Sequence, residues 1–456
     1  MDRLSTHQKR GLALAAVAAL SALYLLQMAS PLRLTPDSVI YLSIGASAAE
    51  GKGFLFRGYP TLHPPGYPAL VAALDLLGLG VSWAFVALNC LLLALGMAAC
   101  YGVLRLSFGL ERPRAAFLCC LSALSYLFLN HATLPLSDIP FFGVSMACLF
   151  AAARGEQEVG ARRWGALAVA LLYALAATTL RTAGVALLPA LLWACLPPRP
   201  AAGPRRGCAP RHTNGAQAAE RRGWPRGRRI TVITIALALL IALAIGAAVL
   251  SRTMYFRVLV GQYTALGRGG ALWQALSYRL TECGQVSANL PYSKSPALVQ
   301  AAFPLIGMLA MGFALAGLWH RKGSFRAADV YVLVHMLILC VWPYWDARFW
   351  LPVLPLLMAW ASHAVDGLWR RPLFRLAVRV YLVFFILAGA AALAYTTRIS
   401  LSGRRFPESY QYELFQPTYR VAFGRPQPGD RGRVDQSSLD VLRRYEPRAA
   451  AIRRIP

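Results

Sequence analysis

Long apolar runs separated by short polar turns dominate the chain. The runs cover residues 11–29, 82–104, 115–134, 139–153, 164–180, 183–196, 230–250, 298–319, 327–344, 349–366 and 376–396. Most approach the roughly 20 residues with which an α-helix crosses a bilayer. The pattern therefore predicts an all-α polytopic membrane protein with about eleven transmembrane helices.

The comparatively polar and glycine-rich segment 31–66 interrupts this pattern soon after the first apolar run. Ile40, Ile44 and Ala48 have helical spacing, which predicts an interfacial helix over 37–50. Thr35 is placed to cap this helix, with Pro36 at its first position. Two prolines at 64 and 65 suit the start of a second helix over 66–77.

Composition supports the membrane class and gives the topology. Of 456 residues, 57% are hydrophobic and 14% are charged, and the mean hydropathy is +0.48. The net charge of +28 would suggest nucleic acid in a soluble protein. Here the basic residues recur in alternate short loops, as the positive-inside rule predicts for cytoplasmic loops. They are Lys9 and Arg10, then Arg105, Arg112 and Arg114, then Arg154, Arg162 and Arg163, then the series from Arg199 to Arg229, then Arg321, Lys322 and Arg326, then Arg370, Arg371 and Arg375.

This alternation predicts a multi-pass membrane protein with a cytoplasmic N-terminus. The compact loops favour a bacterial inner (plasma) membrane. A transmembrane domain over 1–396 would include an outer loop 31–66, a basic cytoplasmic linker 198–229 and an outer loop 251–297. Residues 397–456 would form a short outer, periplasmic extension. The loop 251–297 and the tail are arginine-rich, but long segments translocate largely regardless of charge. A cleaved signal peptide ending near Met28-Ala29-Ser30 is the alternative for the first run.

Motifs of soluble enzymes are absent from the sequence. It contains no P-loop, no GxGxxG after a strand, no GxSxG and no HExxH. Seven of the nine cysteines lie in apolar runs, and no CxxC or other metal-type spacing occurs. Neither a disulfide framework nor a zinc site is indicated.

Two acidic residues at the predicted outer face are the catalytic candidates. Asp37 lies in the first turn of the interfacial helix, and Asp138 lies in a short turn before Pro140. Two such carboxylates can deprotonate a hydroxyl, hold a divalent cation or stabilise an oxocarbenium-like sugar. Each also has a structural alternative, because Asp37 complements a helix dipole and Asp138 suits a helix N-cap.

Four basic residues on the same predicted face are candidates for binding an anionic group: Lys52, His63, Arg181 and Arg348. An arginine between two apolar runs, as at Arg181, is expensive unless it is paired or reaches lipid headgroups. Arg348 has Asp346 beside it as a structural partner, His63 can bond within its own turn, and Lys52 can simply be solvated. Tyr41, Glu50, Tyr67 and Asp346 lie near these candidates in sequence and would shape the site.

Five stretches of the sequence occur in an order that spans most of residues 1–370: PDSVIYLSIGASAAEGKGF, LHPPGYPALVAAL, LPLSDIPFF, TTLRTAGVALLPALL and ARFWLPVLPLL. In this order they resemble the GT-C class of membrane glycosyltransferases. Within the class they resemble the protein O-mannosyltransferases and lipid A aminoarabinose transferases of glycosyltransferase family 39.

The resemblance implies a sugar donor carried on a polyprenyl phosphate and an acceptor that enters from the outer face. Asp37 would be the base or would position the acceptor, and Asp138 would be a second acid. His63, Arg181 and Arg348 would lie near the lipid phosphate. Some relatives carry paired acids where this chain has Asp37-Ser38, so a divalent cation between Asp37 and Asp138 stays open.

We therefore expect an inverting glycosyltransferase whose partners are a polyprenyl-phosphate sugar, membrane lipids and an acceptor glycan, lipid or protein, with no nucleic acid. A transporter or flippase of lipid-linked sugars is one alternative, and it would show broken helices and related halves. A noncatalytic membrane scaffold is the other.

Overall fold

The computed structural model describes residues 6–61, 63–196, 260–261, 264, 268–340, 342, 344–410 and 412–451. Within these ranges the chain is helical apart from one two-stranded hairpin. The predicted linker 198–229 and the predicted span 230–250 lie outside the described residues.

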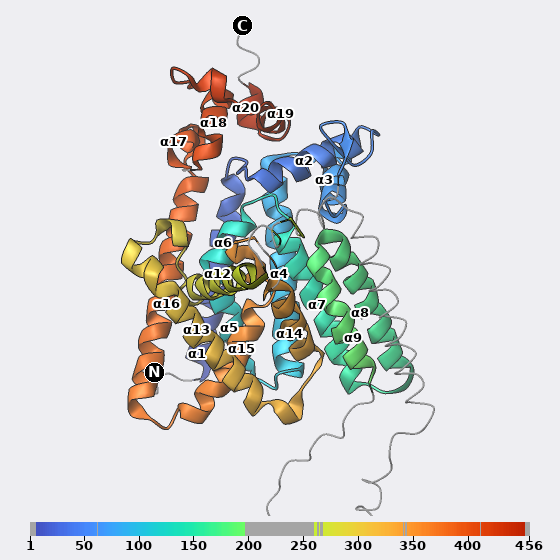
Figure 1. Ribbon diagram of the computed structural model, residues 1–456, viewed down its shortest axis with the longest axis vertical. Coiled ribbons are helices and arrows are strands. Elements are labelled where there is room, and N and C mark those ends of the chain that lie inside the picture. The colour runs from blue at the N-terminus through green and yellow to red at the C-terminus, as the bar shows by residue number, and fades with distance from the viewer. Residues whose placement is uncertain are drawn as a thin grey trace, which may run out of the picture.

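A bundle of α-helices forms the body of the molecule (Figure 1). Its helices are α1 (Thr6–Leu26), α4 (Ser82–Leu106), α5 (Arg112–Ala123), α6 (Tyr126–Ala132), α7 (Asp138–Gln157), α8 (Gly160–Leu180), α9 (Leu187–Cys195), α12 (Arg268–Ala288), α13 (Ala297–His320), α14 (Ala327–Cys340), α15 (Leu354–Leu368) and α16 (Pro372–Ser400). The 3₁₀ turns among them are η1 (Gln27–Ala29), η2 (Thr182–Ala186), η3 (Tyr292–Lys294), η4 (Lys322–Ser324) and η5 (Ala347–Trp350).

Four of these helices, α4, α8, α13 and α16, are long and apolar enough to cross a membrane. The pair α5 and α6 adds a fifth candidate, although it bends by 60° at its break. Of the eleven predicted runs, several others form shorter helices among the described residues; 183–196, for example, is the turn η2 followed by the 9-residue α9. An all-α membrane architecture is confirmed, whereas the number of spans stays a prediction.

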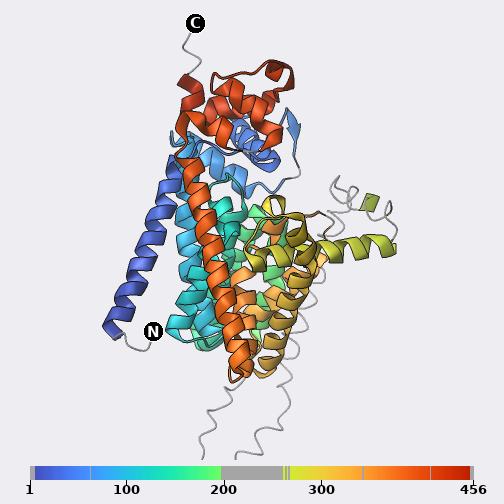
Figure 2. The same cartoon turned by 90° about the vertical axis from the view of Figure 1, so that its left-hand side faces the viewer.

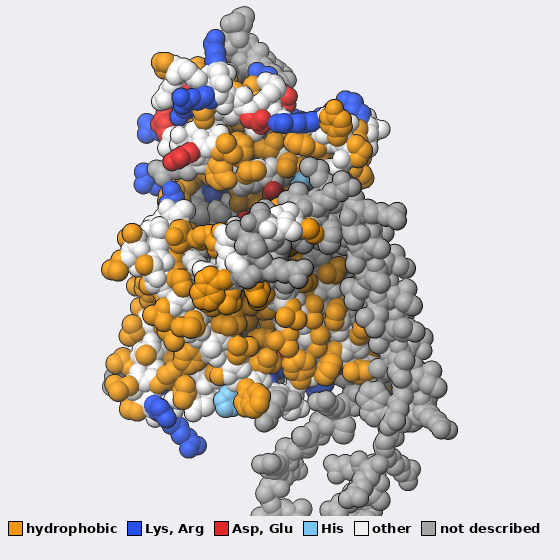
Figure 3. All heavy atoms as spheres, in the orientation of Figure 1, with side chains coloured by type: hydrophobic (Ala, Val, Ile, Leu, Met, Phe, Trp, Pro, Cys, Tyr) orange, Lys and Arg blue, Asp and Glu red, His pale blue; other side chains and the backbone are white. Residues whose placement is uncertain are grey.

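The surface of the bundle is apolar around its middle (Figure 3). Leu172 on α8, Leu309 on α13 and Leu387 on α16 are all more than half exposed. Soluble monomers rarely expose large apolar patches, so this surface is the one that lipid would cover.

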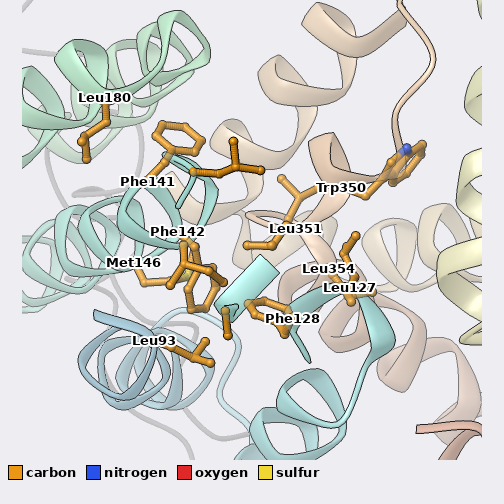
Figure 4. Close-up of a cluster of buried hydrophobic side chains, with 14 of the residues drawn as sticks. Leu93, Leu127, Phe128, Phe141, Phe142, Met146, Leu180, Trp350, Leu351 and Leu354 are labelled. Atoms are coloured by element: carbon orange, nitrogen blue, oxygen red, sulfur yellow. The ribbon is translucent and has the colours of Figure 1, made fainter. Parts of the chain in front are cut away.

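The bundle interior is packed with large apolar side chains from helices distant in sequence (Figure 4). Phe128 of α6 meets Phe142 of α7 edge to face, with ring centroids 4.9 Å apart. Leu93 of α4 and Leu351, which follows η5, lie in the same cluster. The short segment after Trp345 is thereby fixed to the core of the bundle.

A cap of short elements covers the end of the bundle at which α7 begins and α8 ends (Figure 2). It contains α2 (Pro36–Ala49), β1 (Leu55–Phe56), β2 (Tyr59–Pro60), α3 (Gly66–Leu76), η6 (Gly403–Arg405), α17 (Phe406–Ser409), η7 (Glu413–Phe415), α18 (Gln416–Ala422), η8 (Asp430–Arg433), α19 (Gln436–Tyr445) and α20 (Pro447–Ala451). The predicted helices over 37–50 and 66–77 are confirmed as α2 and α3. We call this end the outer end, following the predicted topology.

The segment 251–297, predicted to be an outer loop, contains the 21-residue helix α12. This helix lies across the bundle rather than along it (Figure 1). Its charged residues hide it from a search for apolar runs. Arg279 and Glu282 are nevertheless buried, because they pair with each other at 3.0 Å.

Candidate functional site

Asp37 is held at the start of α2 by the local sequence. The Thr35 hydroxyl accepts a hydrogen bond from the Ser38 amide at 3.2 Å, and the Ser38 hydroxyl accepts one from the Thr35 amide at 2.7 Å. Pro36 occupies the first turn. The predicted cap is thus confirmed, and it fixes a carboxylate at the positive end of a helix dipole.

Arg348 links Asp37 to Asp346. Its guanidinium is 2.5 Å from the Asp37 carboxylate and 2.9 Å from the Asp346 carboxylate. Asp346 also caps η5, because its side chain accepts a hydrogen bond from the Arg348 amide at 3.0 Å. The Asp346–Arg348 pair, predicted as a structural alternative for Arg348, is therefore present, and Arg348 also pairs with Asp37.

Arg181 forms an ion pair with Asp138. Arg181 has an extended backbone where α8 ends, and Asp138 is the first residue of α7. The two side chains are 17% and 2% exposed, so neither is a solvated surface charge. The second carboxylate oxygen of Asp138, Oδ2, is buried and has no hydrogen-bond partner. Burying an unpaired arginine between apolar helices would cost free energy, and the ion pair with Asp138 offsets this cost.

Phe349 connects the two ion pairs. The guanidinium carbon of Arg181 lies 5.2 Å from the centre of its ring, and that of Arg348 lies 5.5 Å from it. Both are within the range of a cation–π contact. The structure thus brings Asp37, Asp138, Arg181 and Arg348 together, although they come from four separate segments of the chain.

Aromatic side chains and His63 border this cluster on the side of the first loop. The Tyr41 ring meets the rings of His63 and Tyr67 edge to face, at 5.7 and 5.5 Å. The His63 Nδ1 lies 2.8 Å from the Thr61 hydroxyl, so it bonds within its own turn as the structural alternative proposed. Burial lowers the pKa of His63, and the Asp37 carboxylate acts in the opposite sense. Asp37 is therefore close enough to act on this ring electrostatically.

Gly66 lets the first loop approach Arg181. A Cβ atom at this position would lie 2.7 Å from the backbone carbonyl of Thr179, two residues before Arg181. Side chains larger than hydrogen cannot take that place without a shift. The start of α3 is thereby packed against the end of α8.

Glu50 and Lys52 lie away from the cluster, at the other end of α2. They bind each other at 2.8 Å, and Glu50 also pairs with Arg444 of α19. These hydrogen bonds from Lys52 and Arg444 lower the pKa of Glu50. The structure therefore places both residues in a contact between the first loop and the part of the cap formed by η6 to α20 (residues 403–451), which we call the C-terminal cap.

Glu282 supports the site but was not among the candidates. Its carboxylate accepts hydrogen bonds from the Asp346 amide at 2.7 Å and from the Trp350 indole at 2.9 Å. Arg279 forms an ion pair with Glu282, and the Glu282 side chain is fully buried. The available signal in the sequence was an acidic and a basic residue three positions apart in a segment that had been assigned to a loop.

No group of three or more His, Cys, Asp or Glu side chains that could hold a metal occurs among the described residues. Asp37 and Asp138 each bind an arginine instead. Each acid–arginine pair places a carboxylate that can accept a proton beside a guanidinium that can bind an anionic group.

Comparisons with known proteins give one kind of match. No family model matches the sequence, and no curated protein matches it. The fold is similar to two crystal structures of ArnT from Cupriavidus metallidurans. The structure bound to undecaprenyl phosphate has 18% identity and a TM-score of 0.47, and the match covers 91% of this chain and 70% of that chain. The apo structure has 16% identity and a TM-score of 0.48, with 95% and 75% covered.

Proposed function

We propose that the chain is an integral membrane glycosyltransferase. It would transfer a sugar from a polyprenyl phosphate to a hydroxyl group of an acceptor at the outer face, with inversion at the anomeric carbon. The observation that carries the proposal is the Asp37 carboxylate held by Arg348, with a second acid–arginine pair on the same aromatic ring. The sequence resemblance described above supplies the substrate class.

In the proposed reaction the acceptor oxygen attacks the anomeric carbon while the bond from that carbon to the phosphate oxygen breaks. Asp37 orients the acceptor hydroxyl and takes its proton. The electron pair of the broken bond stays on the departing phosphate, which Arg348 and Arg181 neutralise. Both arginines already sit in a partly buried place, where their charges act more strongly than in water.

The remaining residues have supporting roles in this proposal. Asp138 orients Arg181, and Asp346 orients Arg348. His63, Tyr41 and Tyr67 form the wall on the side of the first loop, with His63 nearest the lipid phosphate. Membrane embedding follows from the substrate, because a polyprenyl tail is soluble only in the bilayer while its phosphate lies at the surface.

The test compares the wild type with Asp37→Asn in matched amounts, using radiolabelled sugars on polyprenyl phosphate and membranes separated into lipid, glycan and protein fractions. We expect labelling in one fraction for the wild type and at least a 10²-fold slower rate for the variant, the scale of a lost catalytic acid–base group. Asp440→Asn is the control, because Asp440 lies on α19 beside the Glu50 contact instead of the cluster. Equal labelling by wild type and Asp37→Asn would contradict the assigned role of Asp37.

A transporter of lipid-linked sugars is the second candidate, since α5 and α6 form a helix broken by a 60° bend. Broken helices line the substrate sites of many transporters. Reconstituted vesicles decide between the two. A transporter would move an intact lipid-linked sugar between leaflets without an acceptor, whereas the proposed transferase would release free polyprenyl phosphate only when an acceptor is present.

A further inference from the structure

A cavity with basic walls lies at the end of the bundle opposite Asp37. It has a volume of about 540 Å³ and opens between the ends of α4 and α7 and the start of α5. At a helical rise of about 1.5 Å per residue, Arg154 lies about 24 Å along α7 from Asp138. The cavity is therefore separate from the proposed active site, and the predicted topology places it at the cytoplasmic surface.

Three arginines line this cavity: Arg105, Arg112 and Arg154. The Arg105 guanidinium donates to the carbonyl of Leu110 at 2.5 Å and so has a structural task as well. The Arg154 guanidinium is 3.7 Å from the Glu158 carboxylate, and its side chain is 57% exposed. Glu158 is the one acidic residue in the lining. Three guanidiniums against one carboxylate leave an excess of positive charge in a single cavity.

The rest of the lining gives the cavity an apolar side. Ala98 and Gly102 of α4 and Phe150 of α7 lie within the same cavity. α4 is one of the helices long enough to cross the membrane. The Arg154 guanidinium carbon lies 5.9 Å from the centre of the Phe150 ring, so the charged and apolar sides adjoin. A free phosphate compound would use the arginines alone, whereas a phospholipid has both a phosphate and a chain to place here.

We infer that this cavity binds the phosphate headgroup of an anionic phospholipid from the adjacent leaflet, with an acyl chain against α4 and Phe150. Anionic lipids are attracted to basic pockets between transmembrane helices at this surface. The site is independent of the proposed transfer reaction, because it lies at the other end of the bundle and shares no residue with the Asp37 cluster.

The test titrates the detergent-purified full chain with phosphatidylglycerol and with phosphatidylcholine, and counts bound lipid by native mass spectrometry. We expect the wild type to prefer phosphatidylglycerol. The double variant Arg112→Gln/Arg154→Gln should lose about thirtyfold in affinity for it, since each basic residue near a membrane surface contributes about fivefold. The single variant Arg112→Gln, at an exposed residue, should lose about fivefold on the same basis.

Two controls make the result specific. Arg370→Gln/Arg371→Gln removes two exposed charges from the loop before α16, outside the cavity lining, and should keep the wild-type preference. Arg112→Lys/Arg154→Lys should restore most of the affinity, because it restores the charge. Equal losses in both Gln pairs would reduce the effect to general surface charge and overturn the inference. Glycerol 3-phosphate or inorganic phosphate competing as well as the phospholipid would overturn it in favour of a free phosphate ligand.

Discussion

Arg348 is the residue on which the proposed site depends most directly. It contacts the carboxylates of Asp37 and Asp346, and its guanidinium lies against the same ring as that of Arg181. A lysine keeps the charge but cannot bridge two carboxylates with a planar fork. Substitutions of Arg348 can therefore test separately whether the reaction needs the positive charge and whether it needs the geometry of the guanidinium.

We predict that Arg348→Gln lowers the rate of sugar transfer by 10²-fold or more, the scale of a lost oxyanion donor, and that Arg348→Lys recovers only part of it. The measurement is the initial rate with saturating polyprenyl-phosphate donor and matched protein amounts. Arg425→Gln removes an exposed ion pair with Glu408 in the C-terminal cap and should remain near the wild-type rate. A rate within twofold of wild type for Arg348→Gln would remove this side chain from the mechanism.

His63 offers a prediction about pH. Burial lowers its pKa in the folded protein, whereas the unfolded chain keeps the ordinary value near 6.5. The unfolded state then binds the proton more readily, so stability is unaffected well above pH 6.5 and falls as the pH drops below it. We expect the thermal midpoint of His63→Gln to fall less than that of the wild type between pH 7 and pH 5. At pH 8 the imidazole is neutral in both states, so any difference there reports the lost contacts with Thr61 and with the Tyr41 ring. Parallel midpoint curves from pH 8 to pH 5 would contradict the prediction.

At the scale of elements, the packing of α3 on α8 determines how the first loop meets Arg181. Gly66 leaves no room for a Cβ beside Thr179. We predict that Gly66→Ala displaces the start of α3 and lowers both the thermal midpoint and the transfer rate. The free energy of unfolding should fall by about 1–3 kcal/mol, the cost of an overpacked contact. Gly165→Ala is the matched control. Gly165 lies on α8, the helix against which Gly66 packs, and a Cβ atom there would have no neighbour within 4 Å. It should be neutral or slightly stabilising. Equal behaviour of the two variants would show that the close approach is unimportant.

Elements of this fold could be predicted from sequence where a local signal exists. Thr35 and Pro36 predicted the start of α2, and the apolar run 82–104 predicted α4. The break between α5 and α6 has a weaker local signal, because Ser125 caps α6 by accepting a hydrogen bond from the Leu127 amide at 3.3 Å but lies within the apolar run 115–134. It is held from outside by Asn289, whose side chain accepts a hydrogen bond from the Tyr126 amide at 2.7 Å and donates one to the Phe385 carbonyl at 2.9 Å. Long-range contacts of this kind cannot be read from periodicity.

The same limit applies to the site. From the sequence, Asp37, Asp138, Arg181 and Arg348 were predicted to lie on one face of the membrane. The sequence did not predict which acid pairs with which arginine, or that both arginines lie against the Phe349 ring. Nor could it separate Lys52 and Glu50 from that group, since the length of α2 and the contact with Arg444 place them elsewhere. The pairs Asp37–Arg348 and Asp138–Arg181 are properties of the folded bundle, because each joins residues from separate segments.

At the scale of the whole molecule, the C-terminal cap holds the segment that leads into Asp37. The Tyr419 hydroxyl accepts a hydrogen bond from the Leu34 amide at 2.7 Å and donates one to the Leu32 carbonyl at 2.8 Å. Glu446 accepts a hydrogen bond from the Leu32 amide at 2.7 Å. The last helices of the chain thus fix the backbone directly before α2, and Figure 2 shows these red helices above the blue helices of the first loop.

Tyr419→Phe tests whether this long-range support matters for the reaction. Loss of the hydroxyl leaves two buried backbone groups unpaired, at a cost of about 1–3 kcal/mol each, and frees residues 32–34 to shift the start of α2. We expect a lower thermal midpoint and a slower transfer rate per folded molecule, because Asp37 loses its alignment with Arg348. Tyr59→Phe, at a hydroxyl of a side chain that is 76% exposed, should change neither quantity. A variant that is less stable yet transfers sugar at the wild-type rate would mean that the cap stabilises the fold without positioning Asp37, and the coupling between the two ends of the chain would then be structural only.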